Sequence, residues 1–411
     1  MDISFIMPSR NNLKYLKWSY ASIRKHQRGH NVQICVADDN STDGTWEWCI
    51  ETMKSDPEFN AIRNDSGNRM GHTILYDVLV NDVAKHDICL IWHCDMYLCP
   101  GTLNSIEKHI KPKTIVSLTR IEPPLHPKGP EKIILDCGLE PEDFDEDKLL
   151  HMLEMEYEPL YQDKSTTGIF APWAFFKKDF IEIGGHDQLF APQSKEDSDI
   201  FNRFKLNGCE FIQTWEGFVY HMTCRGSRYN PTLTNVGIES AEWLKQNEKS
   251  SRNFARKWGH DVMHDMLMDP IIPPKFNITI NVENATLGIL WVLEPYCTTI
   301  SCDNAKLIEQ YIESEQANTD YDLSARVLHV DKNYTPHDFM IVVNAKAFAR
   351  DDLNCIRHMG MIIEQNAPDK NSTFQLGNLK IISTDYELPD MTNLIKKDYV
   401  ATPESILEYD I

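Results

Sequence analysis

Acidic, basic and histidine side chains gather in short clusters along the first half of the chain, each next to an apolar run. In chain order the clusters are Pro8-Ser9-Arg10-Asn11-Asn12, Asp38 to Thr45, Trp92 to Met96, Gly184 to Asp187 with Glu196 to Asp199, and His221 with Arg225 and Arg228. Carboxylates take up protons and hold hard divalent cations, whereas planar guanidinium groups suit phosphate oxygens. The residue types therefore predict a site that takes an anion together with a divalent metal.

The adjacent pair Asp38-Asp39 is the first candidate for ligand recognition. Two neighbouring carboxylates cannot share a poorly solvated site without cost unless hydrogen-bond donors or cations pair with them. The imide N–H of a uracil base is one such donor. The alternative is a capped turn, in which Asn40, Ser41 and Asp43 bond the first N–H groups of the next helix, and for these three residues we favour capping.

Apolar runs that alternate with helical patterns must position these clusters. Strands are predicted at Ile3–Met7, Val32–Ala37 and Ile88–His93, and helices at Asn12–His26, Trp46–Lys54 and Gly71–Lys85. This alternation predicts an α/β fold with a mostly parallel, doubly wound sheet. Ligands of such sheets bind beyond the carboxyl ends of the strands, which is where Asp38-Asp39 and His93-Cys94-Asp95 fall.

The pattern restarts near residue 270, and we expect the chain to divide there. Residues 237–268 read as helical, and three prolines between 270 and 274 mark a boundary. Beyond it, the order of strands and helices is that of a ferredoxin-like βαββαβ unit, with a turn joining the strands at Ala325–Val330 and Phe339–Val343. The predicted parts are a catalytic domain over 1–230, a helical extension over 231–270 and a smaller α+β domain over 271–411.

Charge and composition limit the classes of partner. The 411-residue chain carries 41 Lys and Arg against 62 Asp and Glu, which gives a formal net charge of −21. A field of that sign repels phosphate backbones and anionic lipid, so we expect neither nucleic-acid binding nor membrane docking. The eleven cysteines form no CxxC pair, and no secretion signal or membrane span is visible, which favours reduced thiols and a cytoplasmic protein.

The order and spacing of the clusters resemble those of the family-2 glycosyltransferases, whose nucleotide-sugar-binding fold is of the GT-A type. The resemblance covers residues 1–230, and it is closest to viral and bacterial members with a similar His-x-Asp-Met strand end, here His93 to Met96. It implies a Rossmann-like doubly wound mixed sheet and a hexosyltransferase, in the host cytoplasm if the protein is viral. The implied donor is a nucleotide-diphospho-sugar, with a UDP-sugar favoured, and the implied acceptor is a hydroxyl of a glycan or of another molecule.

The segment Glu196-Asp197-Ser198-Asp199 is similar to the Glu-Asp-x-Asp motif of that family. An inverting transfer needs a carboxylate that takes the proton from the attacking hydroxyl. The resemblance points to Asp197 as this base, with Glu196 beside it. The alternative is structural, because acidic residues in the first turn of a helix are favoured by the helix dipole.

The third cluster is where the family holds its metal. The family usually shows Asp-x-Asp at this strand end, whereas this chain has His93-Cys94-Asp95. The resemblance implies metal ligation by Asp95 and by His221. One Asp and one His, completed by diphosphate oxygens and water, suit Mn²⁺ better than Ca²⁺, with Mg²⁺ as the second choice. For His93, a packed histidine that does not bind the metal is at least equally expected.

The other residues that the resemblance assigns to the donor lie at strand ends or in loops. They are Pro8, Ser9, Arg10, Asp38, Asp39, Arg69, Cys94, Asp95, Gly185, Asp187, Arg225 and Arg228.

Two functions from other classes compete with the transferase. A catalytically silent module that binds a nucleotide-sugar or glycan is favoured by the missing carboxylate at His93. A nucleotidyltransferase would need a glycine-rich phosphate loop soon after the first strand. Because Pro8-Ser9-Arg10-Asn11-Asn12 contains no glycine, the sequence speaks against this third function.

Overall fold

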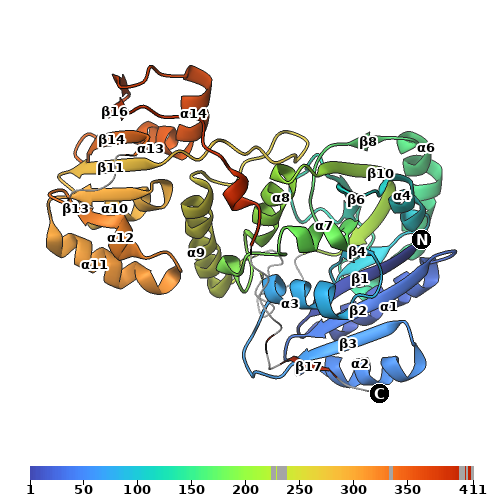
Figure 1. The fold of residues 1–411 in the computed structure, drawn as a ribbon. Helices are drawn as coiled ribbons and strands as arrows, with labels where there is room; N and C mark the ends of the chain where they lie inside the picture. The colour runs from blue at the N-terminus through green and yellow to red at the C-terminus, as the bar shows by residue number, and fades with distance from the viewer. Residues whose placement is uncertain (224–227, 229–237, 333–336, 398–402, 404–405, 409–411) are drawn as a thin grey trace. The chain divides into compact units, whose positions relative to one another are not determined.

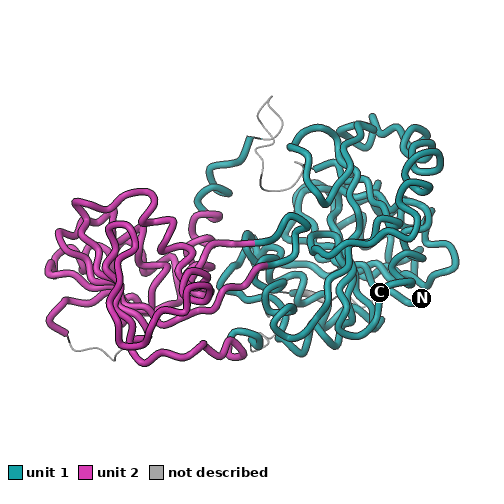
Figure 2. Tube along the Cα trace, turned by 90° about the horizontal axis from the view of Figure 1, so that it is seen from above, with its two compact units in different colours: residues 1–245, 264–270, 394–411 teal, residues 246–263, 271–393 magenta. Residues whose placement is uncertain are grey.

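The computed structural model describes residues 1–223, 228, 238–332, 337–397, 403 and 406–408. The chain forms two compact units (Figure 2). The first unit comprises residues 1–245, 264–270 and 394–411, and the second comprises residues 246–263 and 271–393. Each unit has its own sheet and its own hydrophobic core.

The first unit is built on a mixed sheet of 11 strands among the described residues (Figure 1). One half is parallel, in the order β3-β2-β1-β4, and the other half continues with β9, β6, β10 and β5. Ten of the strands are β1 (Asp2–Ser9), β2 (Asn31–Asp38), β3 (Phe59–Asn64), β4 (Ile88–Ile91), β5 (Met96–Leu98), β6 (Thr114–Glu122), β7 (Lys132–Ile134), β8 (Ser165–Thr166), β9 (Trp173–Phe176) and β10 (Glu210–His221), and the eleventh is β17 (Ile406–Glu408). β1 and β2 are buried almost throughout, which is why they read as continuous apolar runs in the sequence.

Helices cover both faces of this sheet, so the predicted doubly wound α/β fold is confirmed. The bounds are α1 (Leu13–His26), α2 (Thr45–Ser55), α3 (His72–Val78), α7 (Lys177–Glu182) and α8 (Glu196–Leu206). Side chains of α1 and α2 join one core cluster, and side chains of α3, α7 and α8 join another. The rings of Phe201 and Phe204 on α8 lie 5.6 and 5.8 Å from the ring of Trp173 on β9. This packing fixes the helix whose first turn carries Glu196 and Asp197.

The second unit contains a smaller sheet, as predicted, but its topology is not ferredoxin-like. The strand order is β13-β12-β11-β14-β16-β15, and the first four strands are parallel. The bounds are β11 (Ile278–Glu283), β12 (Thr299–Cys302), β13 (Val327–His329), β14 (Phe339–Asn344), β15 (Thr373–Leu376) and β16 (Leu379–Ser383). The predicted hairpin of the strands near 327 and 339 is wrong, because β12 and β11 lie between β13 and β14. The sequence does not predict the short strand β12. In the structure β12 pairs in parallel with both β11 and β13, so β13 and β14 are not neighbours.

The predicted boundaries differ from the compact units at two places. Helix α9 (Ala241–Trp258) is not a separate extension, because its residues from 246 onward belong to the second unit. Residues 394–411 return to the first unit, where β17 (Ile406–Glu408) pairs antiparallel with β3 and Lys397 N–H donates to the carbonyl of Ile183 over 2.9 Å. In the described part of the chain, no helix is both long enough and apolar enough to cross a bilayer.

Candidate active site

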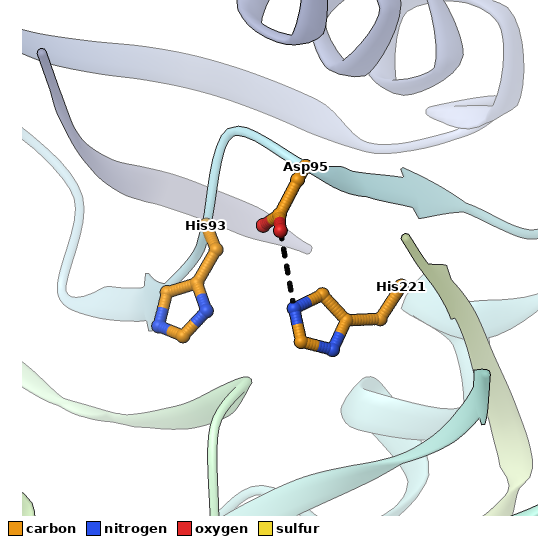
Figure 3. Close-up of side chains that lie close together, drawn as sticks. All are labelled: His93, Asp95 and His221. Carbon is orange, nitrogen blue, oxygen red and sulfur yellow. Dashed lines mark ion pairs between the residues drawn. The ribbon is translucent and has the colours of Figure 1, made fainter. Parts of the chain in front are cut away.

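His93, Asp95 and His221 come together at one edge of the sheet of the first unit (Figure 3). His93 and Asp95 lie in the turn after β4, and His221 is the last residue of β10. Antiparallel pairing of β5 with β10 sets His221 opposite Met96, and the N–H of Met222 donates to the carbonyl of Asp95 over 3.0 Å. His221 Nε2 then lies 3.4 Å from Asp95 Oδ2, and one ligand atom from each of the three residues lies within 4.8 Å of the others.

The charges of this triad fit a divalent cation. Burial lowers the pKa of His93 to about 3, so its imidazole is neutral and keeps a lone pair for a metal. Burial would raise the pKa of Asp95, but the charge of His221 holds it below its usual value, so this carboxyl is ionised. Burial would lower the pKa of His221, but Asp95 and Glu122 raise it to about 9, so a cation bound here would displace a proton from this imidazole. With that proton lost, two imidazole nitrogens and one carboxylate oxygen form a mixed donor set of the kind that first-row cations such as Mn²⁺ accept. The residues present therefore fit the metal that the sequence predicts.

Cys94 turns away from the triad. Its buried thiol donates to the carbonyl of Pro8 over 3.4 Å, and burial raises the pKa of this thiol to about 12. A neutral thiol is a poor metal ligand, since the thiolate is the form that binds metals. The side chain of Cys94 therefore supports the end of β1 rather than the cation.

Glu196 and Asp197 form a pair of poorly solvated carboxyls at the start of α8. The side chain of Glu196 is buried, and its Oε2 accepts no hydrogen bond from the residues that the structure describes. Burial and the neighbouring charge of Asp197 raise the pKa of Glu196, and burial raises the pKa of Asp197. Two carboxyls in one dry site hold a proton more tightly than a solvated carboxyl does, which suits a general base for neutral pH.

Asp199 has a structural role in the same helix. Its Oδ2 pairs with Arg203 Nε over 2.8 Å, and both side chains are fully buried. Arg203 also donates to the carbonyls of Ile183 and Gly185, over 3.0 and 2.5 Å. The pair therefore ties α8 to the Gly184-Gly185 turn and leaves Asp197 and Glu196 as the candidates for proton transfer.

The turn at Gly184 to Asp187 is held by a buried carboxylate–histidine pair. Asp77 on α3 contacts His186 Nδ1 at 2.7 Å and accepts the backbone N–H of His186 at 3.0 Å. Asp187, predicted to touch the donor sugar, accepts the N–H of Leu189 over 3.1 Å and pairs with Lys397 over 3.1 Å. In this structure the carboxylate of Asp187 is thus engaged in holding its own loop and the returning C-terminal segment.

The carboxylates of Asp38 and Asp39 differ in the number of hydrogen bonds that they accept. Asp39 accepts from Asn64 Nδ2 over 2.7 Å and from the N–H groups of Met70 and Gly71, each over 2.9 Å. Asp38 accepts only the N–H of Ser41, over 3.2 Å, and its buried Oδ2 has no hydrogen-bond partner among the described residues. Burial raises the pKa of Asp38. Arg63 Nε lies 3.6 Å from Asp38 Oδ2, within ion-pair distance. Of the two candidates for base recognition, Asp38 is therefore the one with an oxygen that accepts no hydrogen bond from the described residues.

Of Asn40, Ser41 and Asp43, which the sequence favours as caps of the next helix, Asp43 is the one whose side chain accepts an N–H at the start of α2, that of Thr45 over 3.1 Å. Asp43 Oδ1 accepts from Thr45 Oγ1 over 2.6 Å, and its Oδ2 accepts the N–H of Leu13 over 2.9 Å. Asp43 thereby joins the first turns of α2 and α1. Ser41 Oγ accepts the N–H of Asn11 over 2.9 Å, which fixes the loop after β1.

The predicted basic residues have different surroundings. Arg10 is exposed after β1, beside the buried Ser9 and Pro8. Arg69 is largely buried, pairs with Gln193 and lies 3.8 Å from Glu242. Arg228 donates to Glu239 over 2.7 Å and lies over the ring of Trp243. Arg225 lies outside the described residues.

Tyr76 on α3 connects the carboxyl pair electrostatically with the triad. Burial raises its pKa well above the usual value, and the charges of Asp197, Glu196 and Asp95 raise it further. The ring of Tyr76 lies 5.6 Å from that of His186 and 5.7 Å from that of His72, whose ring in turn lies 6.4 Å from that of His93. A row of rings thus connects the turn at Gly184 to Asp187 with the triad.

Sequence reasoning missed two residues of this region. Glu122 ends β6 and contacts His221 Nδ1 at 2.8 Å. His72 opens α3, and its ring lies stacked 6.4 Å from the ring of His93. The signal for Glu122 is the one that identified Asp38, an acidic residue at the end of an apolar run, but four prolines between 123 and 130 make this segment look like a loop.

A doubly wound sheet with polar clusters beyond its carboxyl ends defines an α/β ligand-binding domain. Residues 4–183 match the family model described as Glycosyl transferase family 2. The match covers less than half of the chain, and over these residues the resemblance to this family seen in the sequence is confirmed.

Three solved structures are similar at low identity. One is GalNAc-T7 with UDP, GalNAc and Mn²⁺ (14% identity, TM-score 0.44, covering 62% of this chain and 48% of that chain), so the chain spans about half the length of that relative. The mannosyltransferase PcManGT from Pyrobaculum calidifontis in complex with GDP-Man and Mn²⁺ has 14% identity and a TM-score of 0.42 and covers 79% and 77%. S. aureus TarS 1-349 in complex with UDP-GlcNAc has 16% identity and a TM-score of 0.37 and covers 62% and 75%. No curated protein matches.

Proposed function

We propose that the first unit is an inverting glycosyltransferase that moves a hexose from a nucleotide-diphospho-sugar to a hydroxyl of a glycan or another acceptor. A UDP-sugar is the favoured donor. The observation that carries this proposal is the pair of poorly solvated carboxyls, Glu196 and Asp197, near the His93–Asp95–His221 triad in a domain of this family. A base and a cation site are the two groups that a displacement at a sugar phosphate needs.

Asp197 is the proposed base. It takes the proton of the acceptor hydroxyl while that oxygen bonds to the anomeric carbon from the face opposite the diphosphate. The bond from the anomeric carbon to the diphosphate oxygen breaks, and the configuration inverts. Glu196, buried beside it, keeps the proton affinity of the pair high through its charge and the dry surroundings.

Asp95 and His221 are the proposed ligands of Mn²⁺ or Mg²⁺, and His93 is proposed as a third ligand. A cation bound there would neutralise the charge that grows on the leaving diphosphate. Asp38 is the proposed partner of the base imide, since its Oδ2 accepts no hydrogen bond from the described residues, although Arg63 Nε lies 3.6 Å away. Arg69, whose guanidinium is largely buried, and Arg10 are the proposed partners of anionic parts of the donor.

Enzyme assays with a panel of UDP- and GDP-sugars and Mn²⁺ test this function. We expect donor hydrolysis or transfer by the wild type and a loss of 100-fold or more in kcat for Asp197→Asn, on the order of what a general base contributes. Asp147→Asn, an exposed acidic residue of helix α5 (Glu146–Met152), is the matched control and should keep full activity. Turnover of no donor, or an unchanged rate for Asp197→Asn, would overturn the proposal.

A silent nucleotide-sugar- or glycan-binding module is the second candidate, because His93 stands where the family usually has a carboxylate. Tight binding of UDP without turnover of any donor would favour it. For either function we propose a cytoplasmic location, since the ten cysteines that the structure describes are all free thiols.

A further inference from the structure

Glu122 is a buried carboxylate next to the proposed metal site. It ends β6, and its side chain is 3% exposed. Parallel pairing of β6 with β10 sets Ile121 opposite Tyr220, so Glu122 and His221 are the next residues on neighbouring strands. Glu122 Oε1 lies 2.8 Å from His221 Nδ1, which is hydrogen-bond distance. The contact is therefore built into the register of the sheet.

Two basic side chains pair with the Glu122 carboxylate. Lys132 Nζ on β7 donates to Glu122 Oε2 over 2.9 Å, and Arg120 Nε lies 3.4 Å from Oε1. A buried carboxylate of this kind is costly unless it is paired, so the chain supplies two basic residues for one acidic side chain.

The contact decides which nitrogen of His221 is available. An imidazole that gives its Nδ1–H to a carboxylate has only Nε2 left for another partner. In this structure His221 Nε2 is the atom that faces Asp95, at 3.4 Å. Carboxylates that accept from the second nitrogen of a metal-binding histidine fix the ring and raise its basicity.

We propose that Glu122 is a positioning residue that holds His221 with Nε2 toward Asp95 and the cation. This inference rests on the metal site of the proposed function. Glu122 does not touch the cation in this arrangement; it acts through His221. Removing the carboxylate frees the imidazole ring to rotate and to exchange its proton between the nitrogens.

Direct Mn²⁺ binding to the donor-free full chain, followed by electron paramagnetic resonance, tests the inference. We expect Glu122→Ala to weaken Mn²⁺ binding about 10- to 100-fold, the usual effect of losing such a partner. Glu122→Gln keeps an oxygen acceptor for Nδ1–H and should recover most of the affinity. Glu131→Gln is the matched control, because Glu131 pairs with the same Arg120 over 3.0 Å, and it should bind Mn²⁺ within about twofold of wild type.

A second readout needs no metal. In ¹⁵N-histidine-labelled protein, we expect the Nδ1–H proton of His221 to be shifted downfield and protected from exchange, and this signal should be lost in Glu122→Ala. Folded Glu122→Ala with wild-type Mn²⁺ affinity and an unchanged proton signal would overturn the inference. Absence of Mn²⁺ binding by the wild type would instead contradict the metal site of the proposed function, and the proton signal would still decide whether Glu122 holds His221.

Discussion

Gly185 lies so close to Asp77 that a Cβ at position 185 would stand 2.4 Å from Asp77 Oδ2. Its φ is +69°, a conformation that residues with a side chain rarely adopt. The Asp77 carboxylate cannot move away easily, because it is held by the ring and the backbone N–H of His186. The glycine that precedes the predicted sugar-binding loop is therefore required by packing as well as by the turn.

Gly185→Ala should destabilise the first unit by about 3 kcal/mol, since it combines backbone strain with a steric clash against a buried carboxylate. Urea unfolding followed by tryptophan fluorescence measures this change. Gly208→Ala is the matched control, because Gly208 has a φ of +76° but nothing within 4 Å of the added Cβ. It should cost only about 1 kcal/mol. Equal losses for the two variants would show that the contact with Asp77 does not matter.

Asp38 and Asp39 should respond differently to substitution. Asp39→Ala removes the acceptor for one side chain and two backbone N–H groups, so we expect a loss of about 3 kcal/mol of stability. Asp38→Asn removes a buried charge whose pKa is raised, and Arg63, which lies 3.6 Å from it, keeps Asp65 as a counter-charge, so stability should change by less than about 1 kcal/mol. If Asp38 binds the donor base, this variant should instead raise the KM for the donor. Thermal unfolding measures the stability of each variant, and donor titrations measure its KM. A raised KM for Asp39→Ala together with a destabilised Asp38→Asn would show that the two roles are assigned the wrong way round.

The pH dependence of the reaction should report the carboxyl pair. The pKa values of Glu196 and Asp197 are raised, and the base acts only when it is ionised. The value of kcat/KM should therefore increase with pH, with a midpoint above the ordinary carboxyl pKa of about 4. Glu196→Gln removes the carboxyl that shares the site and should move the midpoint to lower pH. A midpoint that stays in place in this variant would argue against a shared site.

The second unit depends on a buried ion network around Glu294. This carboxylate, with a fully buried side chain, pairs with Arg256 Nη2 and with Arg326 Nε, each over 2.7 Å. Glu294→Gln removes the counter-charge of Arg326 and leaves Arg256 with Glu315 alone, at 2.6 Å, so it should destabilise the unit by about 3–5 kcal/mol. Glu283→Gln, an exposed carboxyl on β11, should change stability by less than about 0.5 kcal/mol. Hydrogen exchange of the β11–β14 amides assigns the loss to this unit.

Acid should weaken the same network. Burial would raise the pKa of Glu294, but the charges of Arg326 and Arg256 lower it to about 2 in the folded protein, below the 4.5 of a free glutamate. A lowered folded pKa stabilises the protein above the unfolded value, and this contribution is lost as the pH falls from about 4.5 to about 2. Wild-type stability should fall through this window more steeply than that of Glu294→Gln. Parallel pH profiles would contradict this role for the carboxylate.

The sequence predicts the first sheet well because its central strands are buried on both faces. Ile3–Met7 and Val32–Ala37 are short, continuous apolar runs, and the polar clusters follow them directly. The four-residue strand Thr299–Cys302 alternates polar and apolar residues, and it carries no comparable signal. Short strands of this kind are specified by their neighbours rather than by their own composition.

The candidate site could be predicted in its residue types but not in its hydrogen bonds. Asp38 and Asp39 are indistinguishable in the sequence, and only the loop from Asn64 to Gly71 shows that Asp39 is structural. The role of Glu122 depends on the register of β6 against β10, which no local pattern specifies. Strand ends therefore identify where the chemistry lies, and long-range pairing decides which side chain performs it.

The most direct test of the central claim is an anomalous X-ray difference map, recorded at the manganese edge from crystals soaked with Mn²⁺ and a UDP- or GDP-sugar. We predict one strong peak within coordination distance of Asp95 and His221 Nε2, with the donor diphosphate on its open side and Asp197 facing the anomeric carbon. A bound donor with no metal between Asp95 and His221, or a metal held by other residues, would contradict the proposed site.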